Sequence, residues 1–271
     1  MELTEHKKRW LTAAVAVPLL LYLFFIASEM PFTLLIIAVG LVGQWEYHRM
    51  VGLSEKMTDP GFLWAELLGT AIIAAAHMGS IATIFFLLWA ALFIFAFRAM
   101  YLHTRERASF EILAADLLGV LYLPCLLASL VLLRAGDAGR YWILMAAAIA
   151  FVADTSAYYA GRFFGKHKLS PKLSPGKTIE GAVGGMCGGI LVALIGKAFF
   201  ITGLPVGAAV GMGALGAVFG MLGDLFESMI KRTFGIKDSG SILPGHGGIL
   251  DRIDGLLFAA PVVFCFKYFY A

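Results

Sequence analysis

Ionisable side chains gather in one stretch of this otherwise apolar sequence, between Asp224 and Asp254. Charged groups beside hydrocarbon are costly, and a protein that keeps them usually uses them. Asp224, Ser228 and Lys231 stand at positions i, i+4 and i+7, so they share one face of a helix. Asp251 and Asp254 stand three residues apart at the start of the next apolar run. Carboxylates from two helix ends, together with substrate phosphates, are the oxygen ligands that Mg²⁺ prefers, so the spacing indicates a metal and phosphate site.

The segment between these carboxylates adds basic groups and glycines. Lys231 and Arg232 can pair with phosphate, and the guanidinium of Arg232 can do so in bidentate fashion. Gly247 and Gly248 allow the backbone to come close to a ligand before the next helix begins. His246 is either a phosphate donor or a structural turn residue.

Another acidic residue, Asp154, lies within an apolar run beside Thr155, Ser156 and Tyr158. An acid inside a predicted membrane span needs a cation or hydrogen-bond donors. We therefore interpret Asp154 as a contact for a metal or a substrate.

The stretch 168–181 leads into a further apolar run through Gly176-Lys177-Thr178. A phosphate-binding P-loop needs a glycine five positions before its Gly-Lys pair, and position 171 is a proline, so that motif is excluded. What remains is a lysine, hydroxyls and free backbone amides at a helix start, which suit phosphate. The alternative is an ordinary capped helix with Lys177 at the lipid headgroups.

A structural alternative also exists for the carboxylates. Asp251 could pair with Arg252, and Asp224 with Lys231, as interfacial ion pairs. Asp154 could pair with an arginine of a neighbouring span. The combined spacing favours a site over this set of separate pairs.

Composition determines the class of protein. Of the 271 residues 60% are hydrophobic and 14% charged, whereas soluble domains carry about 45–50% apolar and about 25% charged residues. We therefore expect an all-α, polytopic integral membrane protein without a soluble domain. The formal net charge of +3 is too small to indicate a nucleic-acid partner. The three cysteines lie far apart in apolar runs, which argues against a disulfide framework or a zinc site.

Nine apolar runs are each close to the roughly 20 residues that a spanning helix needs. We place them near 10–28, 31–49, 63–79, 81–99, 112–133, 141–160, 180–201, 206–230 and 251–270. Together they predict a single membrane domain, with N-terminal helices in 1–140 and catalytic helices and cytoplasmic loops in 141–271. The first run follows Lys7, Lys8 and Arg9 without a clear cleavage site, so we expect an uncleaved helix.

Basic residues predict the orientation. With the N-terminus inside, 17 of the 21 Lys and Arg residues fall on the cytoplasmic side, all but Arg134, Arg140, Lys197 and Lys267. Such an excess is typical of cytoplasmic loops. The polar segment after Ser228 and the loop 161–179 are therefore expected at the cytoplasmic face. No transit peptide is recognised, which favours a bacterial inner membrane.

These residues together resemble the signature of the phosphatidate cytidylyltransferases, also called CDP-diacylglycerol synthases. Residues Ser228–Asp254, the signature segment below, meet every fixed position of that pattern: Ser228, Lys231, Arg232, Lys237, Asp238, His246, Gly247, Gly248, Asp251, Arg252 and Asp254. Asp154 with the following Gly161–Lys166, and Ser174–Gly181, also resemble family segments. The latter usually reads Ser-Pro-Lys-Lys-Thr, so Gly176 removes one positive charge. The resemblance covers residues 151–254.

The resemblance implies that CTP and phosphatidate give CDP-diacylglycerol and pyrophosphate, by attack of the lipid phosphate on the α-phosphate of CTP. It implies Mg²⁺ as the cofactor, with K⁺ as its expected companion, and we assign Asp224, Asp251 and Asp254 as metal ligands. The expected catalytic set is these three aspartates with Lys231 and Arg232. The expected substrate-binding set is Asp154, Ser174, Lys177, Thr178, Glu180, Ser228, Lys237 and His246.

Two other classes stay open at this point. A related CTP-dependent lipid enzyme, such as a polyprenol kinase or a CDP-archaeol synthase, would share the architecture. An ion-coupled transporter would also place carboxylates in its spans, but it would more often show inverted repeats, which this sequence lacks. The expected partners are CTP, phosphatidate and the lipid bilayer, with a homodimer left open and no nucleic acid.

Overall fold

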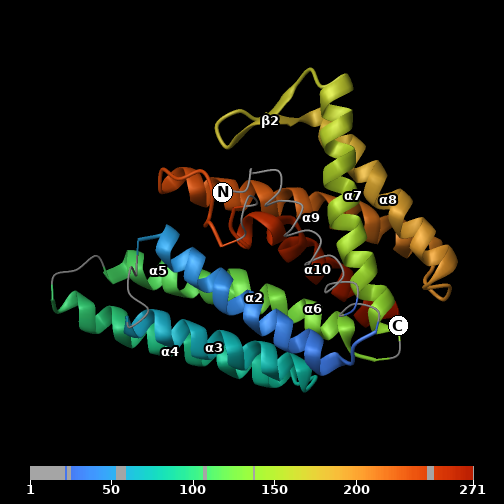
Figure 1. Ribbon diagram of the computed structural model, residues 1–271. Helices are drawn as coiled ribbons and strands as arrows, with labels where there is room; N and C mark the ends of the chain where they lie inside the picture. Colours follow the sequence, from blue (N-terminus) through green and yellow to red (C-terminus); the bar gives the residue numbers. More distant parts are fainter. Residues whose placement is uncertain are drawn as a thin grey trace, which may run out of the picture. The chain divides into compact units, whose positions relative to one another are not determined.

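The computed structural model describes residues 22, 26–52, 59–105, 109–136, 138–242 and 247–270 (Figure 1). The chain divides into two compact units. Unit 1 comprises residues 1–132 and 236–251, and unit 2 comprises residues 133–235 and 252–271. The middle of the signature segment therefore packs with the N-terminal helices, although it follows the C-terminal ones in sequence.

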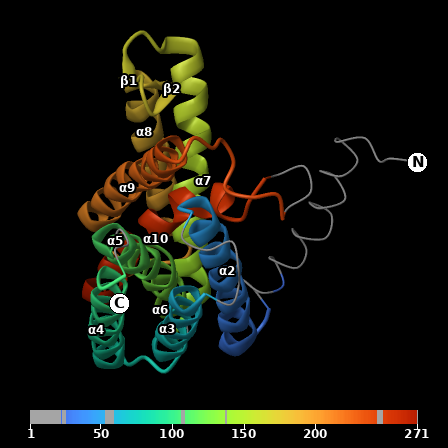
Figure 2. The ribbon, with the colours of Figure 1, turned by 90° about the vertical axis from the view of Figure 1, so that its left-hand side faces the viewer.

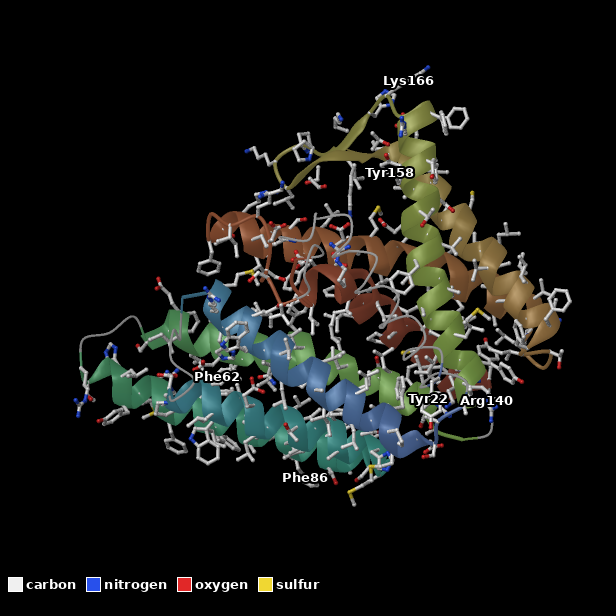
Figure 3. All side chains as sticks on the ribbon, viewed as in Figure 1. Tyr22, Phe62, Phe86, Arg140, Tyr158 and Lys166 are labelled. Atoms are coloured by element: carbon white, nitrogen blue, oxygen red, sulfur yellow. The ribbon has the colours of Figure 1, made fainter. Side chains whose placement is uncertain are left out.

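Unit 1 is built from antiparallel helices in chain order. They are α2 (Glu29–Met50), α3 (Pro60–His77), α4 (Ile81–His103), α5 (Ser109–Val120), a π-helical segment η1 (Leu121–Cys125) and α6 (Leu126–Arg134). Helices α2, α3 and α4 pack as sequential neighbours (Figure 1). Large apolar side chains on α4, such as Phe86, point away from the other helices (Figure 3). An outward apolar face is what a lipid-facing helix requires.

Local sequence signals define where these helices begin and end. The Asp59 carboxylate accepts hydrogen bonds from the amides of Gly61 and Phe62 at 2.9 and 3.3 Å, and Pro60 occupies the first helical position. Both features are typical helix-start signals, because the first amides of a helix lack internal partners. Between α3 and α4, Gly79 adopts a φ of +67°, a conformation that favours glycine.

The predicted span 112–133 forms as α5, η1 and α6 in succession. Pro124 lies inside the π-helical segment. A proline has no amide hydrogen and crowds the carbonyl one turn earlier, and a widened π turn accommodates it without ending the helix. The run therefore continues as one span of 26 residues from Ser109 to Arg134.

Unit 2 contains α7 (Gly139–Phe164), the strands β1 (Lys168–Ser170) and β2 (Ser174–Thr178), α8 (Ile179–Phe199), α9 (Val206–Thr233) and most of α10 (Leu250–Tyr270). The two strands pair antiparallel, with Lys168 opposite Thr178 and Ser170 opposite Ser174. This hairpin, residues 168–178, lies beside the ends of α7 and α8 (Figure 2). It is a small departure from the all-α expectation.

Small residues let the helices of unit 2 approach closely. A Cβ atom added to Gly213 of α9 would lie 2.5 Å from the carbonyl oxygen of Gly189 in α8. Glycine at such contacts is common in membrane proteins, since packing, and not the hydrophobic effect, holds helices together in lipid. The glycines of α8 and α9 thus bring their backbones together.

Seven of the described helices are long and apolar enough to cross a membrane. They are Glu29–Met50, Ile81–His103, Ser109–Arg134, Gly139–Phe164, Ile179–Phe199, Val206–Thr233 and Leu250–Tyr270. The predicted span 63–79 forms helix α3 but is not among the seven, and the predicted span 10–28 lies almost wholly outside the described residues. Polytopic helical architecture is confirmed, whereas nine spans are not.

Two glycines of α9 provide a matched test of this packing. Gly213→Ala should lower the thermal midpoint in detergent, because the new methyl group overlaps α8, and overpacking costs about 1–3 kcal/mol. Gly207→Ala, where a Cβ meets nothing within 4 Å, should leave the midpoint unchanged or raise it. Equal midpoints for the two variants would contradict the close α8–α9 contact.

Candidate functional site

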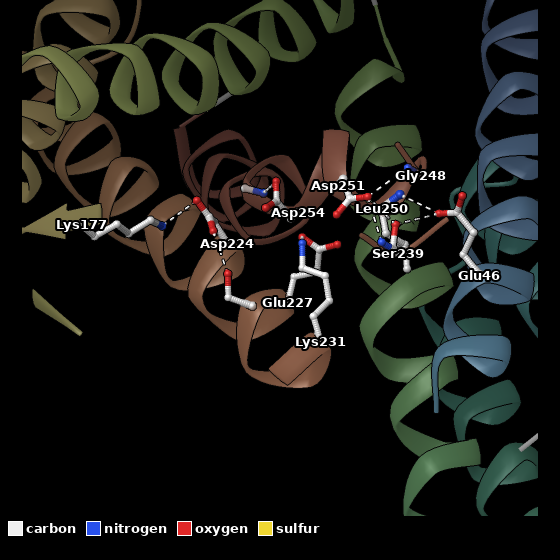
Figure 4. A network of polar contacts seen from close by, with 12 residues as sticks. Glu46, Lys177, Asp224, Glu227, Lys231, Ser239, Gly248, Leu250, Asp251 and Asp254 are labelled. Carbon is white, nitrogen blue, oxygen red and sulfur yellow. Dashed lines mark hydrogen bonds and ion pairs between the residues drawn. The ribbon is translucent and has the colours of Figure 1, made fainter. Parts of the chain in front are cut away.

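The hairpin and α9 are joined by an ion pair in unit 2. Nζ of Lys177, at the end of β2, lies 2.6 Å from Oδ2 of Asp224, and 3.5 Å from the carbonyl oxygen of Met221 (Figure 4). The Ser228 hydroxyl donates to Oδ1 of Asp224 at 3.4 Å, as expected for residues four apart on a helix. The end of β2 and helix α9, which are 44 or more residues apart in the sequence, therefore meet at the Asp224 carboxylate.

A second carboxylate, Asp254 of α10, completes the acidic part of this site. It interacts electrostatically with Asp224 and with Lys231, and its Oδ1 accepts the amide of Gly255 at 2.7 Å. The approach of α9 to α10 is close, because a Cβ at Gly223 would lie 2.4 Å from the Asp254 carbonyl oxygen. Carboxylates held this near each other are stabilised by a shared proton or by a cation.

Glu227 and Lys231 form a buried pair one turn along α9. Glu227 is 0% exposed, and its Oε2 lies 3.1 Å from Nζ of Lys231. This finding corrects the alternative pairing considered from the sequence: Asp224 pairs with Lys177 from the hairpin, and Lys231 pairs with Glu227. Glu227 was not predicted as a site residue, although an acid within an apolar run is itself a signal.

Asp154 of α7 belongs to the same neighbourhood. It interacts electrostatically with Asp224 and with Lys177. Within the described residues, its basic neighbour is thus the hairpin lysine and not the arginine of another span that the alternative required. The structure brings Asp154, Lys177, Asp224 and Asp254 together in unit 2.

The remaining hairpin residues support the fold of this loop. The Thr178 hydroxyl accepts the Gly181 amide at 3.1 Å and so caps α8. Glu180 accepts the amides of Lys166 and His167 at 3.0 and 3.2 Å, and the His167 ring at 2.6 Å. Helix α8 therefore has the ordinary capped start that the sequence analysis named as an alternative. Lys177, however, pairs with Asp224.

Asp251 lies in the part of the signature segment that belongs to unit 1. Its Oδ2 accepts the Ser239 amide and hydroxyl at 2.9 and 3.0 Å and the Gly248 amide at 3.0 Å. Gly247 has a φ of +83°, and a Cβ at Gly248 would lie 2.0 Å from the Ser239 hydroxyl oxygen. At both glycines the backbone therefore packs closely against the side chains of Ser239 and Asp251.

Glu46 of α2 also contacts this segment, and sequence reasoning missed it. Its carboxylate accepts the amides of Ile249 and Leu250, each at 3.0 Å, and lies 3.2 Å from the Ser239 hydroxyl oxygen (Figure 4). The side chain is 0% exposed. The available signal was an acid within the apolar run 31–49.

The other predicted site residues lie elsewhere in the sequence or at exposed positions. Ser174 opens β2, Arg232 is exposed near the end of α9, and Lys237 is exposed in unit 1. His246 lies outside the described residues.

The donor set of unit 2 suits a hard cation. In the described ranges no group of three or more His, Cys, Asp or Glu side chains is arranged to hold a metal ion. Mg²⁺, however, is commonly bound by one or two carboxylates together with substrate phosphates and water. Asp224 and Asp254 supply two carboxylates within one unit, so the residues present fit that ion.

Comparisons with known proteins show the family to which the chain belongs. The profile of the cytidylyltransferase family matches residues 7–270. The phosphatidate cytidylyltransferase of Brucella abortus (strain 9-941) is 36% identical over 274 residues, covering 99% of this chain and 96% of the relative. The Bacillus subtilis (strain 168) protein of the same name is 33% identical over 268 residues, covering 97% of each. The one from Staphylococcus aureus (strain COL) is 48% identical over 125 residues, 46% of this chain and 48% of the relative.

The buried pair of α9 generates a stability prediction. Lys231→Met leaves the Glu227 carboxylate buried without its cation, which should cost about 3 kcal/mol of unfolding free energy. The double variant Glu227→Gln/Lys231→Met removes both charges and should recover most of that loss. Denaturant unfolding of the purified protein in detergent measures both, and an unchanged single variant would contradict the pairing.

Proposed function

The chain belongs to the cytidylyltransferase family, and we propose that it transfers the cytidylyl group of CTP to phosphatidate, giving CDP-diacylglycerol and pyrophosphate. The shared name of the relatives that align over nearly the whole chain supports phosphatidate as the acceptor. The observation that carries the proposal is the Lys177–Asp224 pair, because an ammonium suited to a phosphate lies beside a carboxylate suited to Mg²⁺.

In this reaction an oxygen of the lipid phosphate forms a bond to the α-phosphorus of CTP, and the bond to the β,γ-pyrophosphate breaks. The attacking phosphate is already anionic near neutral pH, so no general base is required. The main task of the protein is to position both phosphates and to offset their charge. Lys177 is suited to this task because its side chain is only 20% exposed and its ammonium lies at the acidic cluster.

We assign Asp224 and Asp254, with Asp251 one turn earlier on the same helix as Asp254, to hold Mg²⁺, with K⁺ as its expected companion. When bound, the cation neutralises charge on the triphosphate. Lys177 then exchanges its contact with Asp224 for a phosphate oxygen. Arg232, exposed at the end of α9, is proposed as a second phosphate contact, and Lys237 and His246 as further ones.

The proposed location follows from the distribution of basic residues. The hairpin and the end of α9 carry the lysines and arginines expected at a cytoplasmic face. We therefore propose a bacterial inner-membrane protein whose site receives CTP from the cytoplasm and phosphatidate from the bilayer.

The function is tested by incubating purified protein with radiolabelled CTP, phosphatidate and Mg²⁺. Release of pyrophosphate with formation of a CDP-lipid supports the proposal. Release of CDP with a newly phosphorylated lipid would identify a lipid kinase instead. A CDP-lipid formed only from an archaeal-type ether lipid would reassign the acceptor, and the absence of any turnover would favour a transporter.

Lys177 offers a prediction with a matched control from the same hairpin. Lys177→Met should lower kcat/KM by about 100-fold, since one well-placed charged contact to a reacting phosphate is worth roughly 3 kcal/mol. Lys172→Met removes an exposed lysine of the hairpin turn and should leave kcat/KM within about twofold. Equal losses in the two variants would mean that general hairpin charge, and not Lys177, matters.

Asp251 provides a test of the cation assignment. Asp251→Asn keeps one oxygen to accept the amides of Ser239 and Gly248, so the thermal midpoint should change little. Loss of its charge should abolish measurable turnover, because a cation is held far more weakly by an amide. Near-normal activity of this variant would overturn the assignment of Asp251 as a metal ligand.

A further inference from the structure

Glu46 is a fully buried carboxylate of α2 whose partners are backbone amides from a segment about 200 residues further along the chain. Among the described residues no lysine or arginine forms an ion pair with it, and N–H groups at the start of α10 offset its charge. The first amides of a helix have no partners within the helix, and its positive dipole end favours an anion. Glu46 therefore caps α10 from another helix.

Both oxygens of the Glu46 carboxylate are in use. Oε1 accepts the Ile249 amide, and Oε2 accepts the Leu250 amide and faces the Ser239 hydroxyl. An amide side chain of the same size offers only one acceptor oxygen, and its NH₂ group would face an N–H donor. The site thus requires a carboxylate, and glutamine does not replace it.

Ser239 links Glu46 to Asp251. Its hydroxyl oxygen lies 3.2 Å from the Glu46 carboxylate and 3.0 Å from the Asp251 carboxylate, and its amide donates to Asp251. A hydroxyl has one hydrogen, so it donates to one carboxylate at a time. The segment is packed tightly here, because Gly248 has no room for a Cβ. A shift of Glu46 therefore displaces the residues that hold Asp251.

A separate polar cluster lies near Glu46 in unit 1. His48, two residues further on, lies 3.8 Å from the Asp116 carboxylate of α5. Arg98 of α4 pairs with Asp116 and, at 3.0 Å, with Asp59 at the start of α3. These contacts connect α2, α3, α4 and α5 to one another, and none of them involves the signature segment.

We propose that Glu46 is a positioning residue for cytidylyl transfer: it sets the start of α10, and through Ser239 the orientation of the Asp251 carboxylate, without touching either substrate. This inference rests on the proposed function. It assigns a role in the reaction to an N-terminal helix that lies outside the residues 151–254 of the family resemblance.

The test compares Glu46→Gln with Asp116→Asn. Both replace a buried carboxylate of unit 1 by its amide, but only Glu46 contacts the signature segment. Two readouts are measured on the full-length protein in detergent. One is amide hydrogen exchange at residues 247–251, followed by mass spectrometry without substrate or metal, and the other is the separation of kcat from KM for CTP.

In Glu46→Gln we expect exchange at the amides of Ile249 and Leu250 to accelerate at least about tenfold, and kcat to fall about 10–100-fold with little change in KM. In Asp116→Asn, compared at a temperature equally far below its own thermal midpoint, exchange and kcat should stay near the wild-type values. Equal losses of kcat in both variants, or wild-type exchange in Glu46→Gln, would overturn the proposal.

Ser239→Ala keeps the test decisive if Glu46→Gln fails to fold. It removes only the linking hydroxyl, and the Glu46 contacts to α10 remain. We expect an intermediate loss of kcat, about threefold to tenfold, and a full wild-type kcat would contradict the link to Asp251. If the wild-type protein itself lacks cytidylyltransferase activity, the proposed function fails, whereas hydrogen exchange still tests whether Glu46 holds the segment.

Discussion

A carboxylate inside an apolar helix must find a cation or several N–H donors, and this requirement organises both units of the protein. In unit 2, Asp224 is satisfied by Lys177 and Glu227 by Lys231. In unit 1, Glu46 is satisfied by the amides that begin α10. The Glu227 pair lies within α9, whereas the contacts of Asp224 and Glu46 connect segments that are distant in the sequence, so these two carboxylates help to determine which elements meet.

Close helix packing makes these contacts geometrically feasible. Apolar surface does not drive helices together within lipid, because lipid tails are themselves apolar. Glycines at the α8–α9 and α9–α10 contacts remove the side chains that would hold the backbones apart. The approach of Gly223 to α10 places the neighbouring Asp224 within electrostatic reach of Asp254. Packing and chemistry therefore depend on the same short stretch of α9.

The site is assembled from helix ends and a short hairpin, without a soluble domain in the described chain. Such a site suits a reaction between a water-soluble nucleotide and a membrane lipid, since both reach the boundary between water and hydrocarbon. Lys177 and Asp224 pair with each other, which lowers the cost of keeping opposite charges there. The same groups are then available to a phosphate and a cation.

Much of this could be read from the sequence, because the decisive signals are local. Hydropathy predicted the helical membrane class, and the spacing of Asp224, Ser228 and Lys231 predicted their shared helix face. The eleven fixed positions of the signature segment indicated the family, which the match over residues 7–270 confirms. Helix caps at Asp59 and Thr178 follow from side chains that bond amides two or three residues away.

Only the tertiary structure decided which groups pair with the buried carboxylates. The sequence offered Lys231 as a partner for Asp224, but a side chain from β2 occupies that position. It gave no reason to connect Glu46 with Leu250, since contacts across about 200 residues leave no periodic pattern along the chain. Of the nine predicted spans, seven correspond to described helices that are long and apolar enough to cross a membrane, and the span 10–28 lies almost wholly outside the described residues. Local rules determine which elements form, whereas the pairing of buried charges depends on which helix ends become neighbours.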